Sequence, residues 1–106
     1  MFKFITRFFK PKENPEVLAA IQVGALLVDV RTPVEFASGH APGSINIPLN
    51  EVHQRLSEFK SHNQIIVFCQ SGNRSGQAKT ILNRSGISSV INGGSWTEIN
   101  KFINKT

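Results

Sequence analysis

The sequence is short of cysteine: among its 106 residues, Cys69 is the only one. A lone cysteine excludes an intramolecular disulfide, so folding needs no oxidising compartment, and we expect a cytoplasmic protein. The same shortage bears on chemistry. A sulfur-based intermediate on Cys69 would have no second thiol in the chain to resolve it, so an external acceptor would have to complete the reaction.

Long apolar runs are also missing. No stretch approaches the roughly 20 apolar residues that a transmembrane helix needs, and the charges within residues 1–12 interrupt any signal-peptide core. The sequence has no zinc-ligand spacing and no helix–turn–helix pattern. Its net charge of +5 comes largely from the two ends, which is typical of solvated surface. We therefore expect no membrane span and no nucleic-acid partner, while the positive field would attract small anions.

Hydrophobic residues make up 40% of the chain and charged residues 18%, a composition typical of a folded globular domain. Strand-like and helix-like segments alternate along residues 14–106. This alternation predicts a single α/β domain with a central parallel sheet of about four to five strands and helices on both faces. Predicted strands cover residues 25–28, 44–48, 64–69 and 87–91, and predicted helices cover residues 15–23, 32–37, 50–60, 76–85 and 96–103.

Several helix boundaries carry capping signals. Asn14 precedes a proline and is predicted to cap the first helix. Thr32 and Glu35 have the spacing of a capping box. Asn50 is predicted to cap the next helix. The spacing of its apolar residues predicts that Val52, Leu56 and Phe59 face the core. The segment Asn92-Gly93-Gly94 is predicted to be a turn after the last strand.

Residues 1–13 form a separate basic, amphipathic arm in this interpretation. Its apolar residues recur at helical spacing, with lysine and arginine off that stripe. Two interpretations stay open. The arm packs on its own domain, which we favour, or it contacts a membrane surface as a basic helix with an aromatic face.

The segment from Cys69 to Ser75 carries the strongest functional signal. An apolar strand ends at Cys69, a short polar loop with Gly72 follows, and a helix comes next. In a parallel sheet this arrangement directs loop N–H groups and a helix N-terminus toward the last side chain of the strand. With Arg74 nearby, these groups would lower the pKa of the thiol. A lone cysteine at a strand end can also be an inert buried side chain, but this polar, cationic loop favours a nucleophile.

Four motifs resemble those of the rhodanese homology domain family, in the family's order and spacing. They are Asp29-Val30-Arg31 with Glu35-Phe36, the run Gly39-His40-Ala41-Pro42-Gly43-Ser44-Ile45-Asn46-Ile47-Pro48, the segment Cys69–Arg74, and Gly93-Gly94-Ser95-Trp96. The resemblance extends from about Asn14 to the C-terminus. Residues 1–12 lie outside it.

The resemblance implies a sulfurtransferase. In the family a cysteine takes the outer sulfur of a donor such as thiosulfate as a persulfide and passes it to a thiophile, which is cyanide or a small-molecule or protein thiol. Carried over, Cys69 is the nucleophile and Arg74 helps to bind an anionic donor. The loop residues that would hold the sulfur anion with their N–H groups are Gln70, Ser71, Gly72, Asn73 and Ser75. No metal or organic cofactor is implied, and we expect a monomer.

A second set of motif residues is assigned to structural support. Asp29, Arg31, Glu35 and His40 could contact substrate at the sheet edge. By analogy with the family, we favour ion pairs and hydrogen bonds that hold the loop. Trp96 is likewise expected to be a packing anchor.

Two other functions are compatible with the same cysteine. Phosphatase and arsenate-reductase relatives of the fold carry five residues between cysteine and arginine, whereas this chain has four between Cys69 and Arg74. The tighter loop favours sulfur transfer. A non-enzymatic sulfur carrier or binding module would use Cys69 in the same way. Gln70 stands where some relatives carry a basic residue, which predicts weak binding of thiosulfate.

Overall fold

The fold is taken from a computed structural model and is described for residues 14–105; the predicted arm, residues 1–13, lies outside the described residues. The elements follow in chain order as α1 (Pro15–Gln22), β2 (Leu26–Asp29), α2 (Pro33–Ser38), β3 (Ile45–Asn46), the 3₁₀ helix η2 (Leu49–Gln54), α3 (Ser57–Lys60), β4 (Ile65–Cys69), α4 (Asn73–Arg84), β5 (Val90–Ser95) and α5 (Trp96–Lys105).

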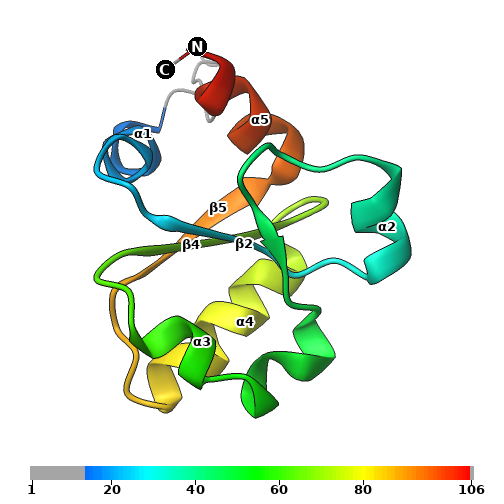
Figure 1. The fold of residues 1–106 in the computed structure, drawn as a ribbon. Coiled ribbons are helices and arrows are strands. Elements are labelled where there is room, and N and C mark those ends of the chain that lie inside the picture. The colour runs from blue at the N-terminus through cyan, green and yellow to red at the C-terminus, as the bar shows by residue number, and fades with distance from the viewer. Residues whose placement is uncertain (1–13, 106) are drawn as a thin grey trace, which may run out of the picture.

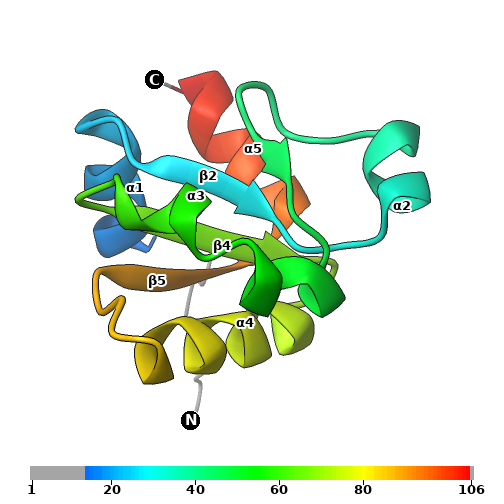
Figure 2. The same cartoon turned by 60° about the horizontal axis from the view of Figure 1, so that its bottom comes forward.

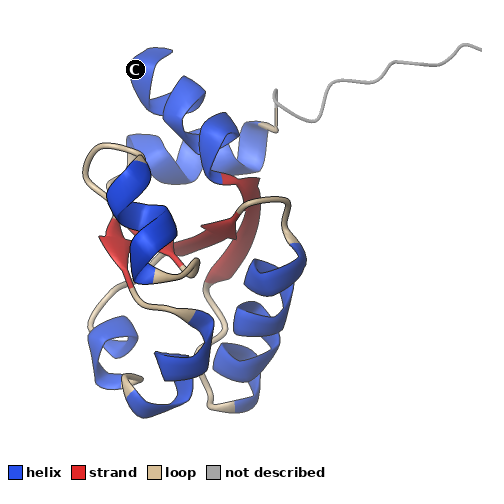
Figure 3. Ribbon diagram, turned by 90° about the vertical axis from the view of Figure 1, so that its right-hand side faces the viewer, coloured by secondary structure: helices blue, strands red, loops and turns tan. Residues whose placement is uncertain are grey.

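A four-stranded sheet in the order β3-β2-β4-β5 forms the centre of the domain, and all of its neighbouring strands are parallel. Helices α1 and α5 cover one face of the sheet, while α3 and α4 cover the other (Figures 1 and 3). Each face has its own buried apolar cluster, one around Phe59 and Leu82 and the other around Phe68 and Ile99. The predicted α/β architecture is confirmed. Within residues 14–105, no helix has the length and apolarity required to cross a membrane.

Two helix starts form as their local sequence predicts. The Asn14 side chain accepts hydrogen bonds from the backbone N–H groups of Glu16 and Val17, at 3.0 and 3.4 Å. At the start of α2, Thr32 Oγ1 accepts from the Glu35 N–H, and a Glu35 carboxylate oxygen accepts from the Thr32 N–H. These caps satisfy N–H groups that no helical carbonyl can reach, so the chain adopts them without tertiary help.

The prediction of one continuous helix over residues 50–60 is wrong. The chain forms a 3₁₀ helix over Leu49–Gln54 and a separate single turn, α3, and Asn50 is not its cap. The backbone N–H of Leu49 donates to the carbonyl of Val30 at 3.0 Å, which ties this segment to the end of β2. With Leu49 held at this position, the 3₁₀ helix ends before Arg55 and α3 follows as a separate turn. In this arrangement both Val52 and Phe59 are buried in the core.

The predicted turn at residues 92–94 is also wrong, because β5 continues through it to Ser95. The pairing of β5 with β4 passes from Val67 opposite Asn92 to Cys69 opposite Ser95, so β5 carries an extra residue. A Cβ on Gly93 would lie 2.7 Å from Ile66 Cγ2 and 2.9 Å from Ile99 Cδ1. Glycine is therefore needed here for close packing against the strand and α5, rather than for a turn.

Candidate active site

Cys69 is the last residue of β4, whose five residues are all buried. The loop after it is shorter than predicted, since α4 begins at Asn73 rather than near residue 76 and Gly72 precedes it with a φ of 100°. Such a positive φ is easily adopted only by glycine. Arg74 and Ser75 therefore belong to the first turn of α4. Figure 2 shows the ends of β2 and β4, the start of α4, and α2 together at one side of the domain.

The sulfur of Cys69 lies among hydrogen-bond donors. The N–H of Gly72 donates to Sγ at 3.1 Å, and Ser75 Oγ lies 3.5 Å from it. Burial acts to raise the pKa of this thiol, since the residue is only 1% exposed. Hydrogen bonding at Ser75, together with the N–H groups of Ser71 and Gly72, outweighs that effect and lowers the pKa below its ordinary value. The arrangement favours a thiolate.

Asn92, on β5, holds this arrangement in place. Its predicted position in a turn gave no indication of this role. Its Oδ1 accepts from the Ser75 hydroxyl at 2.7 Å and from the Gly94 N–H at 3.0 Å. Its Nδ2 donates to the carbonyl of Gly72 at 3.1 Å. One amide thus connects the loop, the first turn of α4 and the bulged strand. An amide two residues beyond a strand start is a weak signal, so only the fold reveals this role.

Arg74 extends from α4 to Glu35 on α2. Its NH1 and NH2 groups donate to the two carboxylate oxygens at 2.7 and 3.0 Å, and both side chains are about one-third exposed. The hydrogen bonds from Arg74, followed by that from the Thr32 N–H, lower the pKa of Glu35 to about 2. In return, Glu35 raises the pKa of Arg74. The cation that was predicted to bind an anionic donor is therefore occupied by a carboxylate.

Asp29 and Arg31 form a second ion pair close to the ends of the strands. Arg31 NH2 lies 2.7 Å from Asp29 Oδ2, and both side chains are almost completely buried. The same NH2 group donates to the carbonyl of Gly39 at 2.7 Å, and the guanidinium carbon lies 4.6 Å from the ring centre of Trp96. The pair thereby joins the end of β2 to the loop after α2 and to the start of α5.

The remaining predicted residues lie at the rim or beside it. His40 is exposed; its ring stacks on Phe36 at 3.8 Å and its Nδ1 is 2.9 Å from the Phe36 carbonyl. In the loop, Gln70 and Ser71 are exposed, as is Asn73, which accepts a hydrogen bond from Gln77 at 3.0 Å. Among the described residues, no group of three or more histidine, cysteine or acidic side chains could hold a metal ion.

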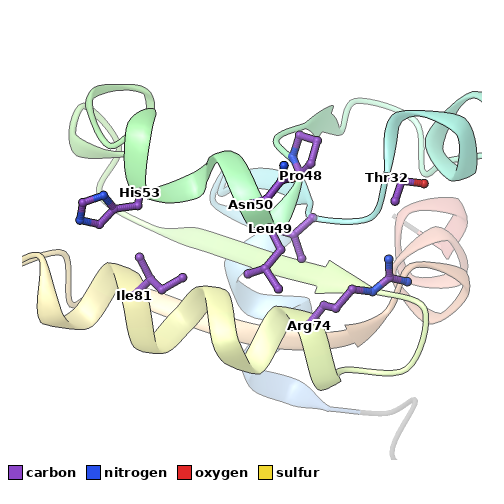
Figure 4. Close-up of a pocket in the computed structure, with 8 residues that line it drawn as sticks. Thr32, Pro48, Leu49, Asn50, His53, Arg74 and Ile81 are labelled. Atoms are coloured by element: carbon purple, nitrogen blue, oxygen red, sulfur yellow. The ribbon is translucent and has the colours of Figure 1, made fainter.

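An open pocket of about 470 Å³ lies between η2 and α4, with Arg74 in its lining (Figure 4). Leu49 and Ile81 provide apolar walls, and the exposed His53 also lines it. Its volume is within the range of small-molecule sites. Because the Arg74 side chain belongs both to this lining and to the Glu35 ion pair, the pocket adjoins the candidate active site.

The chain is similar in sequence to the proteins of one known family. The model of the family described as Rhodanese, "Rhodanese-like domain", matches residues 13–101. This chain belongs to that family. As a rhodanese-like domain it is 39% identical over 74 residues to the thiosulfate sulfurtransferase PspE of Escherichia coli, a match that covers 68% of this chain and 71% of PspE. It is 40% identical over 68 residues to the Bacillus subtilis protein YqhL, of which it spans about half (54%), with 64% of this chain covered.

Solved structures agree with this assignment. The human single-domain sulfurtransferase TSTD1 matches with a TM-score of 0.70 and 29% identity, over 83% of this chain and 92% of that protein. A rhodanese with anions from E. coli matches with a TM-score of 0.65 and 36% identity, over 71% of this chain and 91% of that one. The chain is thus a single rhodanese-like domain whose relatives include single-domain sulfurtransferases.

Proposed function

We propose that this chain is a sulfurtransferase that accepts sulfane sulfur on Cys69 as a persulfide and delivers it to a thiophilic acceptor. The observation that carries the proposal is the Gly72 N–H, which donates to the sulfur at 3.1 Å. Donors arranged in this way stabilise a negative charge on sulfur. The names of the relatives, thiosulfate sulfurtransferases among them, support the same chemistry.

The reaction proceeds in two displacements at one sulfur atom. The Cys69 thiolate attacks the outer sulfur of thiosulfate, the bond between the two donor sulfurs breaks, and sulfite leaves with the electron pair. Cys69 then carries a persulfide. A thiolate acceptor or cyanide attacks the outer persulfide sulfur, and the original thiolate leaves. Charge balances in both steps, and no external oxidant or reductant is consumed.

Each loop contact has a role in this scheme. The N–H groups of Ser71, Gly72 and Ser75 offset the cost of a buried anion, first on the thiolate and then on the persulfide. Asn92 keeps the Gly72 carbonyl and the Ser75 hydroxyl in position. In this proposal Arg74 influences how the donor binds, because its charge lies at the rim rather than against the sulfur.

The acceptor in this proposal is external, because Cys69 is the only cysteine of the chain. A small thiol and a thiol on a partner protein are both chemically sufficient. We further propose that the protein acts as a monomer in the cytoplasm, where thiols are kept reduced and can serve as acceptors.

Intact-mass measurement after incubation with thiosulfate tests the proposal. We expect the mass of one added sulfur, its removal by cyanide, and no added sulfur on Cys69→Ala. Aryl phosphate serves as the comparison substrate. If no sulfane donor adds sulfur while aryl phosphate is hydrolysed in a Cys69-dependent way, sulfur transfer is wrong and the phosphatase alternative takes its place. If persulfide forms but neither cyanide nor small thiols remove it, a dedicated protein acceptor is indicated.

A further inference from the structure

The charges around the sulfur cancel in pairs. Arg31 is neutralised by Asp29, with 2.7 Å between Arg31 NH2 and Asp29 Oδ2. Arg74 is neutralised by Glu35 through two hydrogen bonds. These are the two arginines that the described structure places at the carboxyl edge of β2 and β4. With Cys69 as a thiolate, the side chains of this site carry a net negative charge, and only backbone N–H groups offset it.

This balance matters for the donor, because a thiolate must approach another anion. Coulomb repulsion scales with the charge of that anion, so a dianion such as thiosulfate meets twice the repulsion of a monoanion at the same position. An unpaired Arg74 would compensate for part of this repulsion. A paired Arg74 does so much less, since the opposite charge of Glu35 lies within 3.0 Å of its guanidinium.

Glu35 is not a mobile partner that a donor can simply displace. Besides Arg74, its Oε1 accepts from the Thr32 N–H at 2.9 Å and from the Thr32 hydroxyl at 3.1 Å. Its own N–H donates to Thr32 Oγ1, which completes the capping box of α2. The carboxylate is therefore held over Arg74 by the start of a helix, and a donor that claims Arg74 must compete with a preorganised group.

We propose, on the basis of the function proposed above, that Glu35 is the specificity-determining residue for donor charge: by neutralising Arg74, it makes the site select monoanionic sulfane-sulfur donors, such as organic thiosulfonates, over dianionic thiosulfate. Glu35 was assigned to structural support from the sequence. Its position over Arg74 gives it this second role, because the same carboxylate that caps α2 also sets the charge at the rim.

Methanethiosulfonate and thiosulfate are matched probes, because they differ by a methyl group in place of one charged oxygen. In both reactions the Cys69 thiolate forms a bond to the outer sulfur and the bond from that sulfur to the sulfonyl sulfur breaks. The leaving group is methanesulfinate in one case and sulfite in the other. Both reactions yield the same persulfide, so the acceptor step is common to the two donors and cancels from the comparison.

The variant Glu35→Gln removes the charge and keeps an acceptor oxygen for Thr32 and Arg74. Its matched control is Glu58→Gln, which also removes one negative charge from a carboxylate bound by an arginine, Arg55. Glu58 is on α3, at the opposite end of the sheet from α2 (Figure 2). Both variants therefore have the same net charge, and only Glu35→Gln removes the negative charge that pairs with Arg74.

The measurement is kcat/KM for persulfide formation with each donor in wild type, Glu35→Gln and Glu58→Gln. We expect Glu35→Gln to raise kcat/KM on the order of tenfold for thiosulfate and about threefold for methanethiosulfonate, since the interaction free energy doubles with donor charge. Glu58→Gln should change neither value by more than about twofold. The difference between donors should shrink at high salt, because the rim is partly exposed.

Three results would overturn the inference: no increase for thiosulfate in Glu35→Gln, equal increases for both donors, or the same increases in Glu58→Gln. Each effect is the ratio of kcat/KM in the variant to kcat/KM in wild type with the same donor, so the intrinsic reactivity of that donor cancels. These ratios are then compared between the two donors. Failure of this inference is distinct from failure of the proposed function. If neither donor adds sulfur to wild type, the sulfurtransferase proposal fails; if both add sulfur without the charge-dependent difference, only the role of Glu35 fails.

Discussion

The two ion pairs beside Cys69 use the same chemical groups in different environments. In Asp29–Arg31 both side chains are almost fully buried, and the guanidinium also binds the Gly39 carbonyl. In Glu35–Arg74 both side chains are about one-third exposed. A buried charge that loses its partner is costly, whereas an exposed one is resolvated by water. The first pair therefore holds the domain together, and the second can be altered to change chemistry without unfolding it.

The charged residues of the first motif, Asp29-Val30-Arg31 with Glu35-Phe36, differ in the same way. Asp29, Arg31 and Glu35 lie within seven positions of each other, and their sequence spacing does not distinguish them. Burial does. The Asp29 and Arg31 side chains are enclosed, whereas the partly exposed Glu35 carboxylate pairs with Arg74, whose charge interacts with Cys69.

The largest expected effect is on stability and tests the buried pair. Arg31→Ala should lower the free energy of unfolding by about 3–5 kcal/mol, because it leaves the Asp29 charge enclosed without its guanidinium partner. Urea denaturation followed by fluorescence of Trp96 measures the change. Asp29→Asn combined with Arg31→Ala should recover part of the loss, since no uncompensated charge remains. If Arg31→Ala lowers the free energy of unfolding by less than about 1 kcal/mol, the buried pair contributes no more to stability than the exposed pair, and the proposed difference between them is wrong.

The Asn92 side chain, which is polar but uncharged, is expected to have an intermediate effect on stability. Asn92→Ala should cost about 1–3 kcal/mol, because the Gly72 carbonyl and the Gly94 N–H lose their partner. It should also shift the pKa of Cys69, because the Gly72 loop loses its anchor and the Ser75 hydroxyl loses its acceptor. The pH dependence of iodoacetamide alkylation measures this shift. The exposed Asn83 provides the control variant, Asn83→Ala. An unchanged alkylation profile in Asn92→Ala would show that Asn92 stabilises the fold but does not position the loop.

Arg74→Ala, in contrast to Arg31→Ala, should change donor kinetics more than stability. We expect the free energy of unfolding to change by less than about 1 kcal/mol, as for other partly exposed ion pairs. Persulfide formation from thiosulfate should fall several-fold more than formation from methanethiosulfonate, since the variant leaves Glu35 as an unpaired negative charge at the rim. Parallel denaturation and donor kinetics check both parts. A large drop in stability with unchanged kinetics would place Arg74 with Arg31 instead.

The smallest effect is the pH dependence of the exposed pair. The pKa of Glu35 is lowered from 4.5 to about 2, so its contribution to stability is fully present above pH 4.5 and is lost as the pH falls to about 2. Because the side chain is partly exposed, we expect less than about 1 kcal/mol. The difference in unfolding free energy between wild type and Glu35→Gln, measured from pH 6 to pH 2, should vanish at the low end. A difference that stays constant with pH would contradict the ion pair.

The elements that could be predicted are those whose reasons are local. Asn14 and Thr32 cap helices through neighbours within three residues, and the capping box forms as its spacing predicts. The apolar strand that ends at Cys69 was predictable because a strand buried on both faces has a continuous apolar run. The 3₁₀ helix at Leu49–Gln54 was not, and its first residue is held by a hydrogen bond to the carbonyl of Val30, far back in the chain.

The chemistry of Cys69 was likewise only half visible in the sequence. A thiol followed by a glycine-containing loop and a helix is a local pattern, and the backbone N–H groups that face the sulfur follow from it. Which charges cancel beside that sulfur is a different matter. Glu35 and Arg74 are 39 positions apart, and Ser75 and Asn92 are 17 apart. Such contacts form only when the parallel strands bring their carboxyl ends to one edge of the sheet. The sequence therefore indicates the candidate nucleophile, whereas the tertiary structure determines which charged groups surround it.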